Sequence, residues 1–199
     1  MRTVIEVGAN FGNDTAHLAT PNTRVYAIEP TPTLVDHLTD RFADNKNVSI
    51  HQYAVDIEEG FAEFHIAGTR DWGCSSLYEF NDDIHNQWED RPDFNFTDHV
   101  TVEKIRLDSF ISDNSIDSID YLWIDAQGND FRVLQSLGVY IDIVSAGKCE
   151  GAYTVDLYKG VSNGVYEIRE WLESKGFLCS ITPDNVGKEA DVHFVRDVK

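Results

Sequence analysis

Residues 4–14 read VIEVGANFGND, and this stretch contains the pattern that decides the fold. Its first four positions are apolar or β-branched except for Glu6, which is typical of a buried strand. Gly8 and Gly12 follow, and a polar segment with Asp14 begins next. Glycine is favoured where the backbone comes close to another group or adopts a positive φ angle. The stretch therefore predicts a strand, a tight turn and a helix, and the turn either binds a ligand or only joins the two elements.

Composition limits the possible partners. The chain has 199 residues, 42% of them hydrophobic, and a formal net charge of −19. Its length and apolar content are typical of one globular domain spanning residues 1–199. Phosphate backbones and anionic lipid surfaces are bound by Lys and Arg, so we expect neither a nucleic acid nor a membrane as partner. We also expect a cytoplasmic protein, because no secretory signal is visible and the three cysteines have no disulfide or zinc-finger spacing.

Hydrophobic periodicity predicts alternating strands and helices along most of the chain. The predicted strands are Thr3–Val7, Arg24–Ile28, Val48–Tyr53, Phe61–Ile66, His99–Ile105, Ile119–Asp125, Ile141–Cys149, Phe177–Thr182 and Asp191–Arg196. The predicted helices are Asn13–Ala19, Thr33–Phe42, Asp130–Leu137 and Val165–Lys175. An irregular, aromatic-rich insertion covers residues 67–98. This order predicts an α/β fold with a mostly parallel sheet and helices on both faces.

Ligands of such sheets bind beyond the carboxyl ends of the strands, where the strand order reverses. The glycine turn ends the first predicted strand, Glu29-Pro30 ends the second about 20 residues later, and Asp56 follows the third. An acid at the second position commonly binds the two hydroxyls of a ribose. NAD and S-adenosylmethionine both fit these three positions, with Asp56 as a contact for the adenine amine.

Charge separates these two cofactors. A pyrophosphate at a helix N-terminus requires free N–H groups and is repelled by a nearby carboxylate. Here Asp14 lies in the first turn of the predicted helix, Glu6 leads into the glycines, and the third glycine of the dinucleotide pattern is missing. The ammonium and sulfonium groups of S-adenosylmethionine would be attracted by both acids. The sequence therefore favours S-adenosylmethionine, with an NAD-dependent oxidoreductase as the alternative.

The same motifs resemble those of a known family over nearly the whole chain. They are Val7-Gly8-Ala9-Asn10-Phe11-Gly12, Ile28-Glu29-Pro30-Thr31-Pro32, Ala54-Val55-Asp56, Cys74-Ser75-Ser76-Leu77, Ile105-Arg106-Leu107-Asp108-Ser109-Phe110, Tyr121-Leu122-Trp123-Ile124-Asp125-Ala126-Gln127-Gly128 and Val133-Leu134. Together they resemble the FkbM family of S-adenosylmethionine-dependent methyltransferases. The resemblance implies the class I, Rossmann-like fold, a seven-stranded sheet whose last strand is antiparallel, and O-methylation as the prevailing activity.

One stretch departs from the family pattern. The family usually reads Lys-Ile-Asp-Val-Glu-Gly-x-Glu where this chain has Trp123 to Asp130, so Trp123 replaces the Lys and Gln127 replaces the first Glu. The roles that the family gives these two positions are therefore not carried over to Trp123 and Gln127. The departure motivates a second alternative, a non-catalytic module that has kept the cofactor-binding fold.

The motifs and strand ends define the candidate site. The predicted cofactor-binding residues are Glu6, Gly8, Ala9, Asn10, Gly12, Glu29, Pro30, Asp56, Ser75, Ser76 and Asp125. Asp125 ends a strand beside the expected methyl position, so it is the leading candidate for a general base, and Glu150 and His193 are further catalytic candidates. The alternative is that Asp125 only caps the following helix. We expect no metal; a divalent cation such as Mg²⁺ would take oxygen ligands from Asp125, Asp130 and Glu150, with Asn129 as a further candidate.

The acceptor is the least constrained part of the prediction. The first strand begins at residue 3, so we expect acceptor contacts from the insertion at 67–98, from the segment after Glu150, and from a partner subunit if the protein is a homodimer. The insertion combines aromatic and acidic side chains, which suit stacking on sugar rings and hydrogen bonding to hydroxyls. They are Trp72, Tyr78, Trp88, Asp71, Asp82 and Asp83. A small-molecule or glycan acceptor, neutral and methylated on oxygen, is therefore expected, unless these aromatic side chains only pack the insertion.

Overall fold

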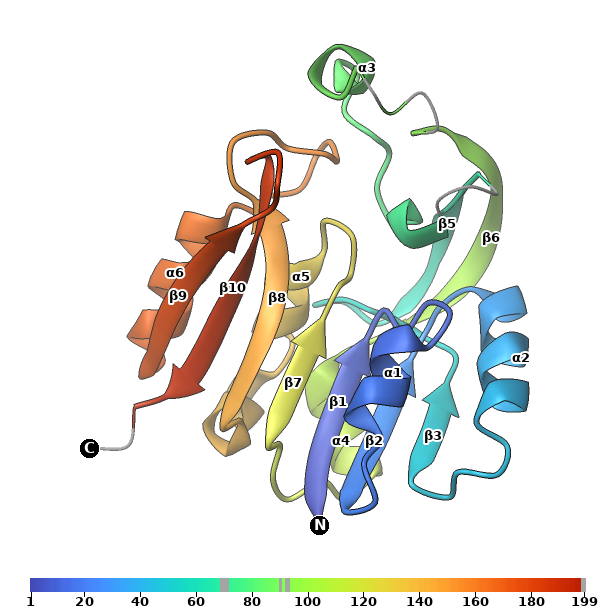
Figure 1. The fold of residues 1–199 in the computed structure, drawn as a ribbon, viewed down its shortest axis with the longest axis vertical. Helices are drawn as coiled ribbons and strands as arrows, with labels where there is room; N and C mark the ends of the chain where they lie inside the picture. The colour runs from blue at the N-terminus through green and yellow to red at the C-terminus, as the bar shows by residue number, and fades with distance from the viewer. Residues whose placement is uncertain (69–71, 90, 92–93, 198–199) are drawn as a thin grey trace.

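The computed structural model describes residues 1–68, 72–89, 91 and 94–197. A seven-stranded sheet forms its centre, with the strand order β3-β2-β1-β7-β8-β10-β9 (Figure 1). Its strands are β1 Arg2–Val7, β2 Thr23–Ile28, β3 Val48–His51, β7 Tyr121–Ile124, β8 Ala146–Ala152, β9 Phe177–Pro183 and β10 Glu189–Arg196. The helices are α1 Asn13–Leu18, α2 Pro32–Arg41, α3 Ile84–Gln87, α4 Leu107–Asp113, α5 Asp130–Gln135 and α6 Val165–Ser174.

The predicted fold class is confirmed. β1 pairs in parallel with β2 and β7, whereas β10, the last strand of the chain, is antiparallel to both β8 and β9. The strand order reverses between β1 and β7, because β2 and β3 extend the sheet on one side of β1 and β7 to β9 extend it on the other. Parallel strands joined by helices bring their carboxyl ends to one edge, and the switch point lies at that edge.

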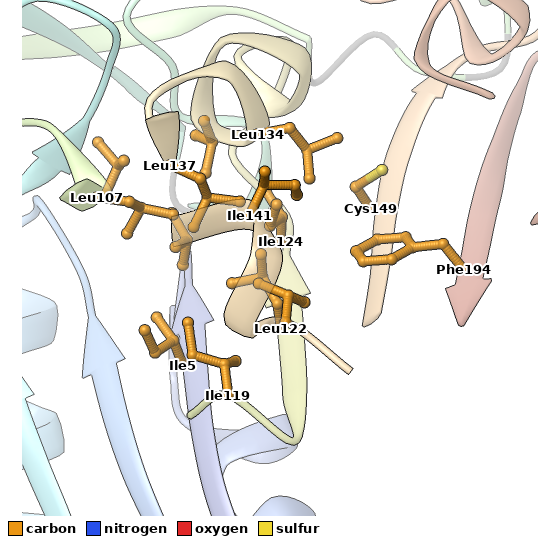
Figure 2. Close-up of a cluster of buried hydrophobic side chains, with 14 of the residues drawn as sticks. Ile5, Leu107, Ile119, Leu122, Ile124, Leu134, Leu137, Ile141, Cys149 and Phe194 are labelled. Carbon is orange, nitrogen blue, oxygen red and sulfur yellow. The ribbon is translucent and has the colours of Figure 1, made fainter. Parts of the chain in front are cut away.

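Helices cover the sheet on both faces. α1 and α2 lie on one face, where Leu38 packs with Val4 and Val25. α4, α5 and α6 lie on the other face, and the larger core forms beneath them (Figure 2). The side chains drawn there include Ile5, Leu107, Leu122, Ile124, Leu134, Leu137, Ile141 and Phe194. This core fixes the carboxyl ends of β1 and β7 relative to each other.

A second, three-stranded sheet stands beside the carboxyl ends of the main strands (Figure 1). Its strands are β4 Ala54–Val55, β5 Gly60–Ala67 and β6 Phe96–Ile105, in the order β4-β6-β5. β5 and β6 pair antiparallel, and they contain the predicted strands Phe61–Ile66 and His99–Ile105. The chain between them contains a 3₁₀ turn at Trp72–Cys74 and helix α3, and has its own small core.

Two local predictions were wrong. Residues 141–144 were expected in a strand, but Gly138–Ile143 forms a 3₁₀ helix that begins at a glycine with a φ angle of 52° and buries Ile141. Helix α4 was not predicted, because its apolar residues Leu107, Phe110 and Ile111 are too few to show a period of their own. None of the helices in the described part of the chain is long and apolar enough to cross a membrane.

Candidate functional site

A pocket opens at the switch point between β1 and β7. It contains about 570 Å³ of empty space, which includes its open mouth. Its walls come from the ends of β1, β2 and β7, from β4 and β5, and from the segment around the 3₁₀ turn. The lining residues are Val7, Gly8, Asn10, Glu29, Pro30, Thr31, Leu34, Tyr53, Ala54, Val55, Phe64, Trp72, Gly73, Ser75, Leu77, Asp125, Ala126, Gln127 and Asn129.

The two glycines of the turn have a packing role that the sequence did not show. Gly8 has a φ angle of 86°, and a Cβ atom there would lie 1.9 Å from the backbone oxygen of Asp125. Gly12 has a φ angle of 77°, and its Cβ atom would lie 2.6 Å from Leu38 and 2.7 Å from Phe42. Gly8 lines the pocket, whereas Gly12 is not among the lining residues. The backbone at Gly8 therefore lies too close to Asp125 for a side chain to fit, and the backbone at Gly12 lies too close to helix α2 and the residue after it.

Glu29 is fixed at the pocket wall by two backbone donors. Its Oε2 accepts the N–H of Asn10 and its Oε1 accepts the N–H of Thr31, both at 2.9 Å. A carboxylate has about four acceptor positions, so each oxygen keeps one for a ligand. Burial raises the pKa of Glu29, and the hydrogen bonds from Thr31 and Asn10 oppose this rise. This geometry leaves two acceptor positions on one carboxylate, as a pair of vicinal hydroxyls requires.

Two further polar atoms near Glu29 have no partner. The Oδ1 of Asn10 and the Oγ1 of Thr31 are buried and make no hydrogen bond, and both residues line the pocket. Buried polar atoms are almost always paired in folded proteins. The unpaired atoms therefore fit a pocket whose polar ligand completes the hydrogen bonding.

Not every residue of the turn reaches the pocket. Glu6 is buried behind it and accepts a 2.6 Å hydrogen bond from the Thr15 hydroxyl. Burial raises the pKa of Glu6 to about 8, with nearby Asp14 adding to the rise. Ala9 is also buried and donates its N–H to the Ile28 oxygen. Neither Glu6 nor Ala9 is among the residues that line the pocket, so neither contacts a ligand bound there.

Part of the pocket lining is apolar. Leu34, Val55, Phe64 and Leu77 belong to this part, as does the aromatic ring of Trp72. The small sheet supplies Val55 and Phe64, which explains why this sheet stands at the carboxyl edge of the large one. An aromatic base with an attached ribose would meet a suitable apolar surface here.

The two predicted serines have different places. Ser75 lines the pocket, and its hydroxyl accepts the N–H of Ala67 at 3.0 Å. Ser76 is fully buried and donates its hydroxyl to the backbone oxygen of Gln127 at 2.7 Å. Ser76 therefore holds the loop after β7 in position.

Asp125 lines the pocket and is linked to a second pocket by hydrogen bonds. Its Oδ1 accepts a 2.6 Å bond from the Gln127 amide, whose Oε1 lies 2.8 Å from the Tyr158 hydroxyl. Burial raises the pKa of Asp125, and the Gln127 hydrogen bond lowers it in part. Gln127 has a φ angle of 48°, an uncommon value for a residue with a side chain. The departure from the family pattern at Gln127 thus places a hydrogen-bond donor on Asp125.

Asp56 is occupied by cations. Arg132 and Lys104 each lie 2.7 Å from one of its carboxylate oxygens, and Asp56 is not among the residues that line the pocket. Burial raises the pKa of Asp56 and the hydrogen bonds from Arg132 and Lys104 lower it, with a net value below the ordinary one. The structure thus gives Asp56 a structural ion-pair network that the sequence did not predict.

Glu150 and Asp130 line the second, smaller pocket beside the first. Burial raises the pKa of Asp130 to about 8 and that of Glu150 to about 10, and neighbouring acids add to both. In the described part of the chain, no group of three His, Cys, Asp or Glu side chains is arranged to hold a metal ion.

His193 lies outside both pockets. It is on β10, between Lys148 of β8 and Ser180 of β9, with Nε2 3.9 Å from Asp191. The structure therefore does not bring it to Asp125.

The aromatic residues of the insertion also separate into groups. Trp88 is 8% exposed and packs in the core of the insertion with Phe80 and Phe94, so it offers no acceptor platform. Trp72 lines the pocket, and Tyr78 donates its hydroxyl to Asn129. Asp82 pairs with Lys159 and Asp83 with Asn86, whereas Asp71 lies outside the described residues.

Known proteins share this architecture. The structure of a precorrin-6y C5,15-methyltransferase from Geobacter metallireducens matches with a TM-score of 0.54 at 11% identity, covering 98% of this chain and 80% of that one. TrmK from M. capricolum, in complex with S-adenosylhomocysteine, matches with a TM-score of 0.52 at 11% identity, covering 98% and 62%. At these identities the similarity shows the fold.

Sequence comparisons identify the family. The 2-O-methyltransferase NoeI of Sinorhizobium fredii is 23% identical over 139 residues, covering 66% of this chain and 55% of that protein. The chain thus spans about half the length of this curated relative. The model of the methyltransferase FkbM domain matches residues 6–179, most of the sequence. The chain belongs to the FkbM family of methyltransferases.

Proposed function

We propose that this protein is an S-adenosylmethionine-dependent O-methyltransferase that acts on a hydroxyl of a small or sugar-containing acceptor. The observation that carries the proposal is the arrangement of Glu29 and Asp125 in one pocket at the switch point. Glu29 has two free acceptor positions for the ribose hydroxyls, the apolar lining residues suit adenine, and the Asp125 carboxylate in the same lining suits the cationic end.

The charge of the pocket supports this cofactor over NAD. No Lys or Arg is among the described residues that line it, whereas two carboxylates are. A pyrophosphate would meet Asp14 in the first turn of α1 and the buried Glu6 behind the turn. The Asp14 carboxylate favours a ligand with an ammonium and a sulfonium instead, whereas burial of Glu6 keeps its carboxyl largely protonated near neutral pH. The unpaired Asn10 and Thr31 oxygens would complete its polar contacts.

The chemistry assigned to the chain is positioning and proton removal. When bound, S-adenosylmethionine supplies an electrophilic methyl group. Asp125 is held in one orientation by the Gln127 amide. Burial raises the pKa of Asp125, and a carboxylate with a higher pKa is a stronger base, which suits a group that accepts a proton from a hydroxyl.

Membership of a methyltransferase family supports methyl transfer, and the relative NoeI, a 2-O-methyltransferase, supports oxygen as the methylated atom. The test is a screen of sugars, phenols and other hydroxylated metabolites for S-adenosylhomocysteine release, with a ¹³C-labelled methyl group to identify the methylated atom by NMR. We expect an O-methyl product, unchanged by a chelator. Methylation of nitrogen or carbon contradicts the proposal. Cofactor binding without turnover on any acceptor indicates a non-catalytic cofactor-binding module instead.

A further inference from the structure

The second pocket lies next to Asp125 and is strongly acidic. Four of the residues that line it are carboxylic acids, Asp130, Glu150, Asp156 and Glu189, and none of the described lining residues is basic. It contains about 320 Å³ including its open mouth, against about 570 Å³ for the cofactor pocket. Its size suits one functional group of a ligand rather than a whole cofactor.

Asp130 gives this pocket an unused acceptor. The side chain is fully buried, and its Oδ1 accepts the backbone N–H of Glu150 at 3.1 Å. Its Oδ2 is buried as well and has no hydrogen-bond partner. A buried carboxyl oxygen without a hydrogen-bond partner costs free energy, and the cost is larger when the group is ionised. The pocket therefore lacks a donor at the position of Asp130, and a ligand that enters it can supply one.

A positively charged group fits this pocket best. Glu150 and Asp130 carry raised pKa values because burial and neighbouring acids, Asp125 among them, oppose their ionisation. A cation with several N–H donors would favour the ionised forms of these acids and supply a donor to the free Oδ2 at the same time. The same residues are not arranged to hold a metal ion, which favours an organic cation.

The position of the pocket connects it to the site of methyl transfer. Tyr158 lines the second pocket, and its hydroxyl lies 2.8 Å from Gln127 Oε1, while the Gln127 amide donates to Asp125. Two hydrogen bonds thus separate the second pocket from the carboxylate that faces the cofactor. We propose that this pocket binds a cationic nitrogen group, an ammonium or guanidinium, of the methyl acceptor, so that the acceptor is a hydroxylated compound that also carries such a group.

This inference rests on the proposed function, but it can be tested separately by binding. The probes are 2-aminoethyl β-glucoside, which carries an ammonium at pH 7.5, and 2-hydroxyethyl β-glucoside, its neutral counterpart. Calorimetric titration of each, with S-adenosylhomocysteine at saturation, gives two dissociation constants. We expect the ammonium probe to bind about tenfold more tightly, the effect of one to two charge-assisted hydrogen bonds. The preference should fall to about twofold or less in Asp130→Asn and Glu150→Gln, which keep the side-chain shape, and stay unchanged in the control Asp142→Asn, an exposed site.

Equal binding of the two probes, no measurable binding of the ammonium probe, or a preference that survives both substitutions would overturn the inference. The two proposals fail differently. A tenfold preference without methyl transfer to any acceptor upholds the cation pocket and rejects the methyltransferase activity. Turnover of neutral and cationic acceptors with equal efficiency upholds the methyltransferase activity and rejects the cation pocket.

Discussion

The side-chain amide of Gln127 donates a 2.6 Å hydrogen bond to Oδ1 of Asp125. The family usually has a glutamate at this position, so the chain has replaced a second carboxylate with a neutral donor. A glutamate here would place a second negative charge next to Asp125 and would raise its pKa further, beyond the rise that burial already causes. The amide instead favours the ionised form of Asp125 and fixes its orientation.

Gln127→Glu should therefore shift the pH dependence of the reaction. Ionised Asp125 is present above its pKa, and the new carboxylate raises that pKa further, so the acid limb of kcat/KM should move up by about one pH unit or more. Gln127→Met removes the donor without adding charge and should move the limb by less. An unchanged profile in both variants would remove Asp125 from the ionisations that control the reaction.

Glu29→Ala should weaken cofactor binding by about 1–3 kcal/mol, because ribose hydroxyls and two backbone N–H groups lose their acceptor. Titration with S-adenosylhomocysteine measures this loss. Glu170→Ala, on the exposed side of α6, is the matched control and should bind as the wild type does. Equal affinities of Glu29→Ala and the control would mean that the ribose lies elsewhere.

Asp56→Asn should destabilise the protein by about 3 kcal/mol, because it leaves Arg132 and Lys104 without their common partner. The folded-state pKa of Asp56 is lowered, so its contribution to stability is present above the unfolded value of about 3.9 and is lost as the pH falls through the lower folded value. Urea unfolding at pH 7 and at pH 3 should thus show a smaller difference between variant and wild type at the lower pH. A stable variant with weak cofactor binding would restore Asp56 as an adenine contact.

Trp88→Ala and Trp72→Ala should affect different properties, the first the stability of the fold and the second the binding of the cofactor. Trp88 is buried in the core of the insertion, so its loss should lower the free energy of unfolding by about 3 kcal/mol. Trp72 lines the cofactor pocket, so its loss should raise the KM for S-adenosylmethionine with little change in thermal stability. The reverse assignment of these effects would contradict the pocket as described.

The first strand, the glycine turn and the position of Glu29 could be predicted from short stretches of sequence. The run of β-branched residues into Gly8 gave the strand and turn, and the acid about 20 residues later gave Glu29 at the pocket wall. The antiparallel last strand followed from the family resemblance. These features depend on hydrophobic period, turn chemistry and strand-end position, which a sequence displays directly.

Long-range contacts could not be predicted in the same way. Arg132 and Lys104 are 76 and 48 residues away from Asp56, and no sequence pattern joins them. A side chain at position 12 would clash with Phe42 at the end of the neighbouring helix. Trp88 packs in a core that residues 157 and 158 help to form. One residue could have been singled out from the sequence. Gln127 departs from the family pattern, and the structure shows that its side chain donates a hydrogen bond to Asp125.

The pocket at the switch point is the proposed binding site of S-adenosylmethionine. Calorimetric titration of the wild-type protein with S-adenosylmethionine, S-adenosylhomocysteine and NAD tests this assignment. We expect both sulfur compounds to bind with one site per chain and NAD to show no measurable binding. Binding of NAD with neither sulfur compound bound would contradict the account and point to a nicotinamide-dependent oxidoreductase.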